Sequence, residues 1–456
     1  MKTTKQNKLP QYFLEKPNLN KVDKSKIYEK LVKSGEDQFR EHFERANEPK
    51  YLNWDKLKYK NPRGLTPEEF WFLVRSFRNV AARKTRIKTE KGEYFVWIRL
   101  PYTEEFLHRI DISSGGQIFA SLDVLSDSNK QKFISRGILE EAIASSQLEG
   151  AHTTRQVAKR MIVEKREPRN QSEQMILNNY NTIVAIEEDY KNKPLSKELL
   201  IELHAMLTDK TVSEDELKRF RRDEDRIVVQ GQIGTDQYIT HIPPKQKFVS
   251  GELDRLINYA NDIDDASFTH PIVKAIFLHF WVGYLHPFTD GNGRLARALF
   301  YWYLLRKDYW TFMYLPISTI IKKAPSQYAL AYIYSEQDSH DATYFFDFHI
   351  RKIMQSLRDF NDYITTKINE NRQIDKIVSK DLKLNDRQKF LLHHLISDKD
   401  AYTTVTSHKT MNNVSRQTAA KDIKELEKVG LIVSERHGKY INYSASDLLS
   451  KQANRL

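Results

Sequence analysis

Residues 286–297 read HPFTDGNGRLAR, and this stretch determines how the helices around it meet. An apolar segment with helical periodicity precedes it and begins with Pro271, and proline is well tolerated in the first turn of a helix. Pro287 disfavours helical geometry at the residue before it, so we expect the first helix to end at His286. The stretch therefore predicts two helices joined by a tight turn that presents His286.

The turn is predicted to bind an anion. Gly291 and Gly293 allow the backbone to approach a ligand closely, because neither residue carries a side chain. A second helix is expected to begin near Asn292, where unpaired N–H groups and the positive end of the helix dipole favour negative charge. Asp290 is placed beside that site, where its carboxylate is suited to hold Mg²⁺ that bridges phosphates.

The side chains around the turn indicate phosphate chemistry. Arg294 and Arg297 are three residues apart, so they share one face of the predicted helix and reach the same region. Guanidinium groups bind phosphate oxygens well, because their N–H donors match the geometry. The imidazole of His286 can take a proton from a hydroxyl group near neutral pH. The stretch thus predicts a site where a hydroxyl attacks a phosphorus atom.

The twelve residues match, without departure, the signature H-x-F-x-[DE]-G-N-G-R-x-x-R of the Fic family, and the chain resembles that family from about Gln117 to Asp362. The resemblance implies transfer of AMP from ATP to a Ser, Thr or Tyr hydroxyl of a protein target, with ATP and Mg²⁺ required and self-AMPylation expected. Family members also transfer UMP, phosphate or phosphocholine, and some remove AMP, so these reactions stay open. A different alternative is a DNA-binding regulator whose Fic domain only senses nucleotide.

The resemblance also implies a role for each residue. His286 is the catalytic base and Asp290 is the metal ligand. The nucleotide-binding residues of the stretch are Gly291, Asn292, Gly293, Arg294 and Arg297.

A helix predicted at about residues 136–150 resembles the inhibitory helix of Fic proteins, [ST]-x-x-x-E-[GN]. Ser145 and Glu149 are four residues apart and therefore share one face of this helix. In the family the glutamate pairs with the second arginine of the signature, which is Arg297 here. The pairing withholds that arginine from the γ-phosphate, so ATP binds unproductively.

A second match to the inhibitory pattern occurs downstream, at residues 366–371, where Glu370 would take the same role. The residues around Glu149 resemble the upstream version of the family's helix more closely. We therefore assign inhibition to Glu149 and keep Glu370 as the alternative.

A β-hairpin is predicted inside the helical region, with strands at about residues 226–229 and 238–242. It resembles the family's flap, which lies over the active site and aligns the target by strand pairing. A hairpin that only covers the core is the alternative. The preceding Phe220-Arg221 resembles the family's approach to the flap, although the usual preceding glycine is absent.

Two residues outside the stretch are assigned to the nucleotide by resemblance. Val228 lies in the predicted flap. Tyr328 lies where the family places a tyrosine near the adenine, and an aromatic ring there can stack on the base. A role for Tyr328 in the hydrophobic core is equally consistent with the sequence.

The domain organisation has three predicted parts. Residues 1–116 form an N-terminal region with a polar arm, a helix that begins at Thr66 with a capping box, and a hairpin within residues 86–100. The Fic domain takes residues 117–370. Residues 371–456 follow the order helix, helix, helix, strand, strand, which predicts a winged helix-turn-helix domain. The predicted fold class is mainly α.

The C-terminal part is only modestly basic. Residues 380–456 contain 14 basic and nine acidic side chains, a net charge of +5. On the predicted recognition helix, Lys421, Lys424 and Lys428 interleave with acidic residues. DNA and a protein partner therefore both stay open as ligands of this domain.

The composition narrows the class of protein. The chain has 456 residues and a formal net charge of +12, a balance that suits an ATP-binding or nucleic-acid-binding protein but does not require either. It has no cysteine, which excludes disulfides and fits a reducing compartment. No long apolar segment or secretory signal is evident, so we expect a cytoplasmic protein without a membrane partner. The target protein and any homo-oligomer are left open.

Overall fold

The computed structural model describes residues 9–34, 36–113, 127–263, 268–377, 383–397, 401–412, 414–437 and 440–453. Its contacts divide the chain into two compact units. The first consists of residues 1–114, 138–158 and 168–356, and the second of residues 115–137, 159–167 and 357–456. The N-terminal region and most of the expected Fic region thus share one unit. The three-part division made from the sequence stays a prediction.

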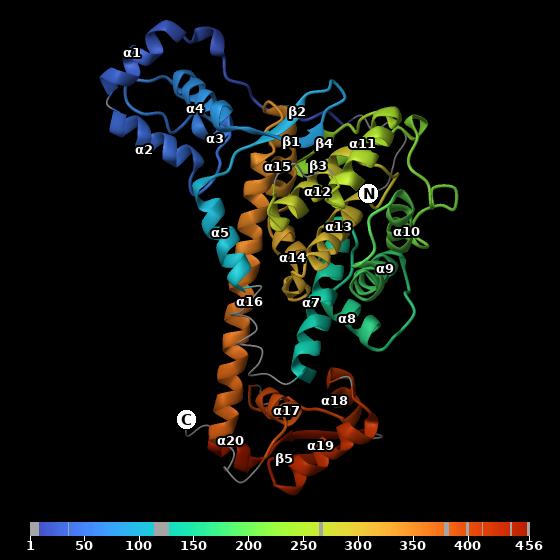
Figure 1. The fold of residues 1–456 in the computed structure, drawn as a ribbon. Coiled ribbons are helices and arrows are strands. Elements are labelled where there is room, and N and C mark those ends of the chain that lie inside the picture. The colour runs from blue at the N-terminus through green and yellow to red at the C-terminus, as the bar shows by residue number, and fades with distance from the viewer. Residues whose placement is uncertain are drawn as a thin grey trace. The chain divides into compact units, whose positions relative to one another are not determined.

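Helices dominate the structure (Figure 1), which confirms the mainly α class. The N-terminal elements are α1 (Lys24–Ser34), α2 (Glu36–Asn47), α3 (Trp54–Leu57), α4 (Pro67–Ala81), β1 (Arg83–Lys88), β2 (Tyr94–Trp97) and α5 (Pro101–Ile112). The central elements are α7 (Asp127–Leu148), α8 (Arg155–Val163), α9 (Gln171–Ala185), a π-helical turn (Ile186–Tyr190), α10 (Lys197–Thr208), β3 (Val229–Ile233), β4 (Asp236–His241), α11 (Gln246–Ala260), α12 (Pro271–Leu285), α13 (Asn292–Arg306), α14 (Ile317–Lys322), α15 (Pro325–Gln337) and α16 (Thr343–Ile377). Short 3-10 helices lie at Leu19–Lys21, Asp223–Asp225 and Trp310–Tyr314.

The core of the first unit is built around α12 and α13, which lie side by side (Figure 1). Nearly every side chain of both helices is buried, including Arg294 and Arg297 of α13. Among them, Phe280, Trp281 and Trp302 are fully buried. Because the turn between α12 and α13 is residues 286–291, the stretch that predicts the site is held between two buried helices.

The N-terminal part follows the local signals closely. Thr66 caps α4, its side chain accepts from the Glu69 N–H, and the Glu69 side chain accepts in return from the Thr66 N–H, so the predicted capping box is present. The predicted hairpin is present as β1 and β2, which pair antiparallel. Part of the polar arm is ordered against the body: residues 10–12 pair with β4, where Gln11 is the parallel partner of Ile239.

The flap hairpin exists, and its second strand lies about where it was predicted, whereas its first strand begins where the predicted one ends. They span residues 229–233 and 236–241, so the turn is only two residues long. Gly231 belongs to β3, not to a loop, and it pairs with Tyr238. The reason is steric, because a Cβ at this position would lie 2.9 Å from the Cγ2 atom of Thr240 on β4. The glycine is therefore required by close strand packing.

The second unit contains α17 (Asp386–Ser397), α18 (Val405–Asn412), α19 (Arg416–Lys428), β5 (Ile432–His437), β6 (Tyr440–Ala445) and α20 (Asp447–Ala453). The first five elements occur in the predicted order. They enclose a small hydrophobic core that includes Leu391, Leu392, Ile423 and Leu426. The assignment of these elements to the winged-helix class stays a prediction.

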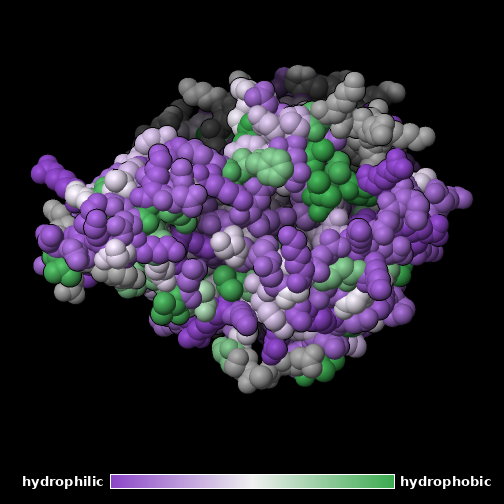
Figure 2. All heavy atoms as spheres, turned by 90° about the horizontal axis from the view of Figure 1, so that it is seen from above, coloured by the Kyte–Doolittle hydropathy of each residue, from purple (hydrophilic) through white to green (hydrophobic). Residues whose placement is uncertain are grey.

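The described surface gives no sign of a membrane segment. No helix within the described residues is long and apolar enough to cross a bilayer. Hydrophilic side chains predominate on the face in Figure 2, and hydrophobic side chains appear there in separate small groups.

Candidate active site

His286 ends α12 in an unusual backbone conformation. Its φ is +48°, in the left-handed region, and its N–H donates to the Val282 carbonyl. Pro287 cannot continue the helix, so the chain turns here and the imidazole faces the turn, as predicted. The Nδ1 atom lies 3.4 Å from the Gly283 carbonyl oxygen, and a proton held there leaves Nε2 as the basic nitrogen. Burial, and next the neighbouring His241, lower the pKa of His286 to about 3, so the ring is neutral near pH 7.

The turn is held rigid by its own side chains. The Asn292 amide both accepts from the Phe288 N–H, at 2.9 Å, and donates to the Phe288 carbonyl, at 2.8 Å. Phe288 is fully buried. Asn292 was assigned to the nucleotide by resemblance. In the structure its amide forms two hydrogen bonds that hold the turn closed. Gly291 is in the left-handed conformation, with φ of +78°, as the N-cap of α13.

His204 of α10 supports the same turn, and the sequence reasoning missed it. Its ring stacks flat on Phe288, with centroids 3.6 Å apart, and its Nε2 atom lies 2.8 Å from the Asp290 carbonyl oxygen. Because a carbonyl only accepts, Nε2 carries the proton. The side-chain Oδ1 of Asp290 accepts from the Gly291 N–H at 2.7 Å. Both contacts orient the carboxylate predicted to hold the metal ion.

Arg294 is fully buried, not a surface residue. Its Nη1 donates to the Leu207 carbonyl at 2.7 Å. Within the described residues, its Nε and Nη2 atoms have no hydrogen-bond partner, and Nη2 lies 3.5 Å from Oδ2 of Asp290. Buried donors are rarely left unsatisfied, so these two point to an anion that the site is built to receive.

Arg297 is also buried, and it reaches α7. Its Nε donates to the Ser145 hydroxyl at 2.8 Å, and its Nη2 donates to the Ser145 carbonyl at 2.9 Å and to Oε1 of Glu149 at 3.0 Å. Arg294 contacts α10 and Arg297 contacts α7, and the charge of Glu149 acts on both guanidinium groups. The pairing expected between Glu149 and Arg297 is present.

The carboxylate of Glu149 lies over the start of α13. A Cβ added to Gly293 would lie 2.1 Å from Oε1 of Glu149, so this approach depends on the glycine. A negative group at a helix N-terminus is favoured by the dipole and by the free N–H groups. The anion cradle predicted for a phosphate is therefore adjacent to a carboxylate of the chain itself.

Three comparisons show which known proteins the chain is similar to. The profile of the Fic/DOC family matches residues 194–304. The chain carries a Fic domain. A protein named protein adenylyltransferase Fic from Nematostella vectensis is 39% identical over 72 residues, which span 15% of this chain and 16% of that relative. A relative with the same name from Drosophila mojavensis is 33% identical over 88 residues, or 19% of this chain and 16% of that protein.

A solved structure with a similar fold comes from Desulfovibrio desulfuricans G20 and is described as a Fic family protein. The TM-score is 0.48 at 20% sequence identity, and the alignment covers 75% of this chain and 96% of that one.

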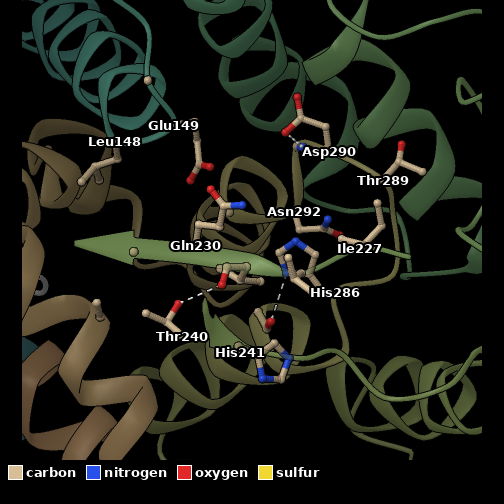
Figure 3. Close-up of a pocket in the computed structure, with 18 of the residues that line it drawn as sticks. Leu148, Glu149, Ile227, Gln230, Thr240, His241, His286, Thr289, Asp290 and Asn292 are labelled. Carbon is tan, nitrogen blue, oxygen red and sulfur yellow. Dashed lines mark hydrogen bonds between the residues drawn. The ribbon is translucent and has the colours of Figure 1, made fainter. Parts of the chain in front are cut away.

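The Fic domain encloses a cleft of about 1270 Å³ beside the turn (Figure 3). Glu149, His286 and Asp290 point into it, and Gln230 on β3 lines it. The volume exceeds that of most small-ligand pockets, which hold about 300–1,000 Å³, so it has room for a nucleotide and part of a second molecule. Val228 lines the same cleft, in the segment just before β3.

Tyr328 of α15 also lines the cleft, and its hydroxyl contacts the buried His279 at 2.8 Å. It therefore combines the two roles that the sequence left open, a packing role and a position beside the site. Glu370, the alternative inhibitory residue, falls in α16, but its side chain lies outside the described residues. The helix continues to Ile377, so the 366–371 pattern does not mark a helix end.

Arg221 is a further residue of the Fic domain whose importance the sequence showed only as part of a resemblance. Its Nε donates to the His286 carbonyl at 2.6 Å, and its backbone N–H donates to the Pro287 carbonyl at 2.8 Å. Arg221 thus fixes the backbone at His286, the predicted base, and at the residue after it. A Phe-Arg pair before a hairpin was the only signal that could have identified it.

Proposed function

We propose that the chain is an autoinhibited protein adenylyltransferase, which transfers AMP from ATP to a Ser, Thr or Tyr hydroxyl of a protein target. The observation that carries the proposal is Arg294, a buried guanidinium beside the N-terminus of α13, two of whose nitrogens have no hydrogen-bond partner within the described residues. A triphosphate supplies the acceptor oxygens that these donors lack. The family similarity supports Fic-type AMPylation.

The turn fits Mg²⁺ as well as phosphate. No group of three or more His, Cys, Asp or Glu side chains that could hold a metal ion occurs within the described part of the chain. Mg²⁺ is commonly bound through one or two carboxylates together with substrate phosphates, and Asp290 is the carboxylate at this turn. When bound there, the ion would neutralise charge on the phosphate oxygens.

His286 supplies the base in the proposed step. Its Nε2 takes the proton of the target hydroxyl, the hydroxyl oxygen forms a bond to the α-phosphorus of ATP, and the bond from that phosphorus to the bridging oxygen breaks. Pyrophosphate leaves, and the AMP-protein ester remains. The N–H groups at the start of α13 and the Arg294 guanidinium stabilise the charge that grows on the phosphate oxygens.

Strand β3 offers the edge on which an extended target segment would align. Strand β4 lies between β3 and residues 10–12, because it pairs with β3 on one side and with those residues on the other. Within the described residues no strand pairs with the other side of β3, and Gln230 of this strand lines the cleft. Strand pairing here would place a hydroxyl of the target near His286.

Glu149 is the inhibitory element in this proposal. It binds Arg297 and lies over Gly293. It therefore competes with the ATP phosphates for the Arg297 guanidinium and for the N-terminus of α13. When Glu149 moves away, Arg297 and the N-terminus of α13 become available to the nucleotide.

The decisive experiment uses α-labelled ATP and Mg²⁺ with the purified chain. We expect weak self-labelling of the wild type, stronger labelling of Glu149→Gly, and none of the double variant that also carries His286→Ala. Glu370→Gly is the matched control and should label like the wild type. Unlabelled Glu149→Gly protein that still binds ATP would favour a nucleotide sensor, and labelling only by another donor would favour a different Fic transfer.

A second function is supported for the C-terminal unit, namely DNA binding through α19. Of the acidic residues that interleave with its lysines, Asp422 is turned inward, whereas Glu425 is exposed. Asp422 is buried, and Arg387 donates to it at 2.7 Å, while Glu425 accepts from Gln388 at 2.8 Å. The exposed side chains of α19 include Arg416 and Lys424, so this face is more basic than the residue count suggests.

Filter binding of the full chain to duplex DNA across a salt series tests this second function. We expect Lys424→Glu to weaken binding and to lower the slope against salt by about 1, as for one phosphate contact. The same change at Lys247, an exposed residue of α11, is the control. Absence of binding at low salt would exclude the DNA proposal.

A further inference from the structure

Both ends of the flap are fastened to the C-terminus of α12, where the last carbonyl groups of a helix have no partner within it. Arg221, before the flap, donates to the carbonyls of Leu285 at 3.3 Å and His286 at 2.6 Å. His241, the last residue of β4, lies with Nε2 2.7 Å from the carbonyl oxygen of Tyr284. Three consecutive carbonyls, those of Tyr284, Leu285 and His286, thus accept hydrogen bonds from His241 at one end of the flap and from Arg221 before its other end.

His241 is held at its second nitrogen too. Its Nδ1 lies 2.7 Å from Oε2 of Glu336 on α15, and the two side chains are only 7% and 18% exposed. Because the Tyr284 carbonyl can only accept, Nε2 carries a proton, and a proton on Nδ1 makes the ring cationic. Burial alone would lower the pKa of His241, but the charge of Glu336 and the hydrogen bond to it outweigh burial and raise the pKa. The geometry therefore describes an imidazolium–carboxylate pair anchored between three elements.

We propose that His241 and Glu336 are positioning residues for the transfer reaction. The pair fastens the second flap strand to the end of α12 and so sets the place of β3 relative to His286. His241 is the direct cross-strand partner of Val229, whose neighbours in sequence line the cleft. This inference rests on the proposed function, and it assigns the position of the target hydroxyl to a pair that also lines the cleft.

The pair also acts on the base through charge. The charged or titratable groups that face His286 are His241 on β4, Glu149 on α7 and Arg221 before the flap. Those that face His241 are Glu336, Arg221, His286 and the side chain of Tyr284, whose ring centroid lies 5.5 Å away. A cationic His241 lowers the pKa of His286, so the His286 ring stays neutral and can accept a proton. Removal of that charge should raise the pKa of His286.

The test uses Glu149→Gly protein as the parent and self-labelling with α-labelled ATP as the measurement. Glu336→Gln keeps the side-chain shape but removes the charge, and His241→Gln removes the imidazolium. For both we expect labelling to slow by about tenfold or more, since misplacement of about 1 Å can cost about 100-fold. ATP affinity, measured by calorimetry, should stay within about twofold, because neither residue binds phosphate. The acidic limb of the pH–rate profile should move to higher pH.

The matched control is Glu202→Gln, the same chemical change at an exposed residue of α10. It should change neither the labelling rate nor the pH profile. Normal labelling of Glu336→Gln with an unmoved acidic limb would overturn the proposal, even if the protein melted at a lower temperature. That outcome would leave the pair with a purely structural role.

A measurement that needs no activity separates this proposal from the proposed function. Amide hydrogen exchange of the flap, residues 229–241, should be about tenfold faster in Glu336→Gln than in the wild type, while α9 exchanges at an unchanged rate. Unchanged flap exchange would overturn the positioning role whether or not the parent labels. A parent that fails to label, together with the expected change in exchange, would contradict the transferase proposal alone.

Discussion

Replacement of Glu149 by glycine is the sharpest test of the latch. The variant loses one charge-assisted hydrogen bond, from Arg297 at 3.0 Å, while both bonds from Arg297 to Ser145 remain. A hydrogen bond to a charged group contributes about 1.5–3 kcal/mol. Because each 1.4 kcal/mol is about a tenfold change in an equilibrium, productive ATP binding should improve by about 10- to 150-fold. The rate of self-labelling below saturating ATP should rise by the same factor.

Two further variants separate charge from packing in this latch. Glu149→Gln keeps a group that accepts from Arg297 but has no charge, so its rate should fall between those of the wild type and Glu149→Gly. Ser145→Ala removes one bond and leaves the carboxylate in place, so labelling should change by less than about fivefold. The measurement is initial rate against ATP concentration. Equal rates for the wild type and Glu149→Gly would refute the reasoning, because the carboxylate then does not compete with ATP.

Three other outcomes are expected. Arg294→Lys in the Glu149→Gly background keeps the charge but loses the planar donors, so labelling should fall by about 100-fold; a rate within about threefold of the parent would show that Arg294 does not contact the phosphates. Thr66→Ala removes half of a capping box and should lower the free energy of unfolding by about 1 kcal/mol in urea titrations, and an unchanged midpoint would contradict this. The pKa of His241 is raised in the folded chain, so the stability that it gains from Glu336 is present below about pH 6.5 and is lost as pH rises through the folded pKa. The difference in Tm between the wild type and Glu336→Gln should accordingly be larger at pH 6 than at pH 9, and the reverse order would disprove the charged pair.

The parts of the site that lie within one turn of chain could be predicted from the sequence. Pro287 determines where α12 ends, and Gly291 allows the left-handed start of α13, so the helix–turn–helix geometry follows from local sterics. The contact of Arg297 with Glu149 could be expected only from the resemblance. Nothing in the local sequence shows that two helices about 150 positions apart would meet there.

The residues missed were those whose role depends on long-range packing. His204 and Arg221 are ordinary residues in their own segments, and they become supports of the turn only because α10 and the flap pack against α12. Asn292 was assigned to the nucleotide by the family resemblance; its amide closes the turn and the residue lines the cleft, so that assignment stays a prediction. Gly231 carries a strong turn signal, and only the proximity of Thr240 on the partner strand explains it.

Glu149 and Arg297 belong to one chain, and this makes the carboxylate a tethered ligand. Its effective concentration is set by the distance that the chain allows and not by the amount of protein in solution. Dilution therefore cannot relieve the contact, and a free carboxylate in the buffer cannot reproduce it. Under the proposed function, activation therefore requires a higher ATP level, or a molecule that binds α7 or its surroundings more tightly when Glu149 has moved away.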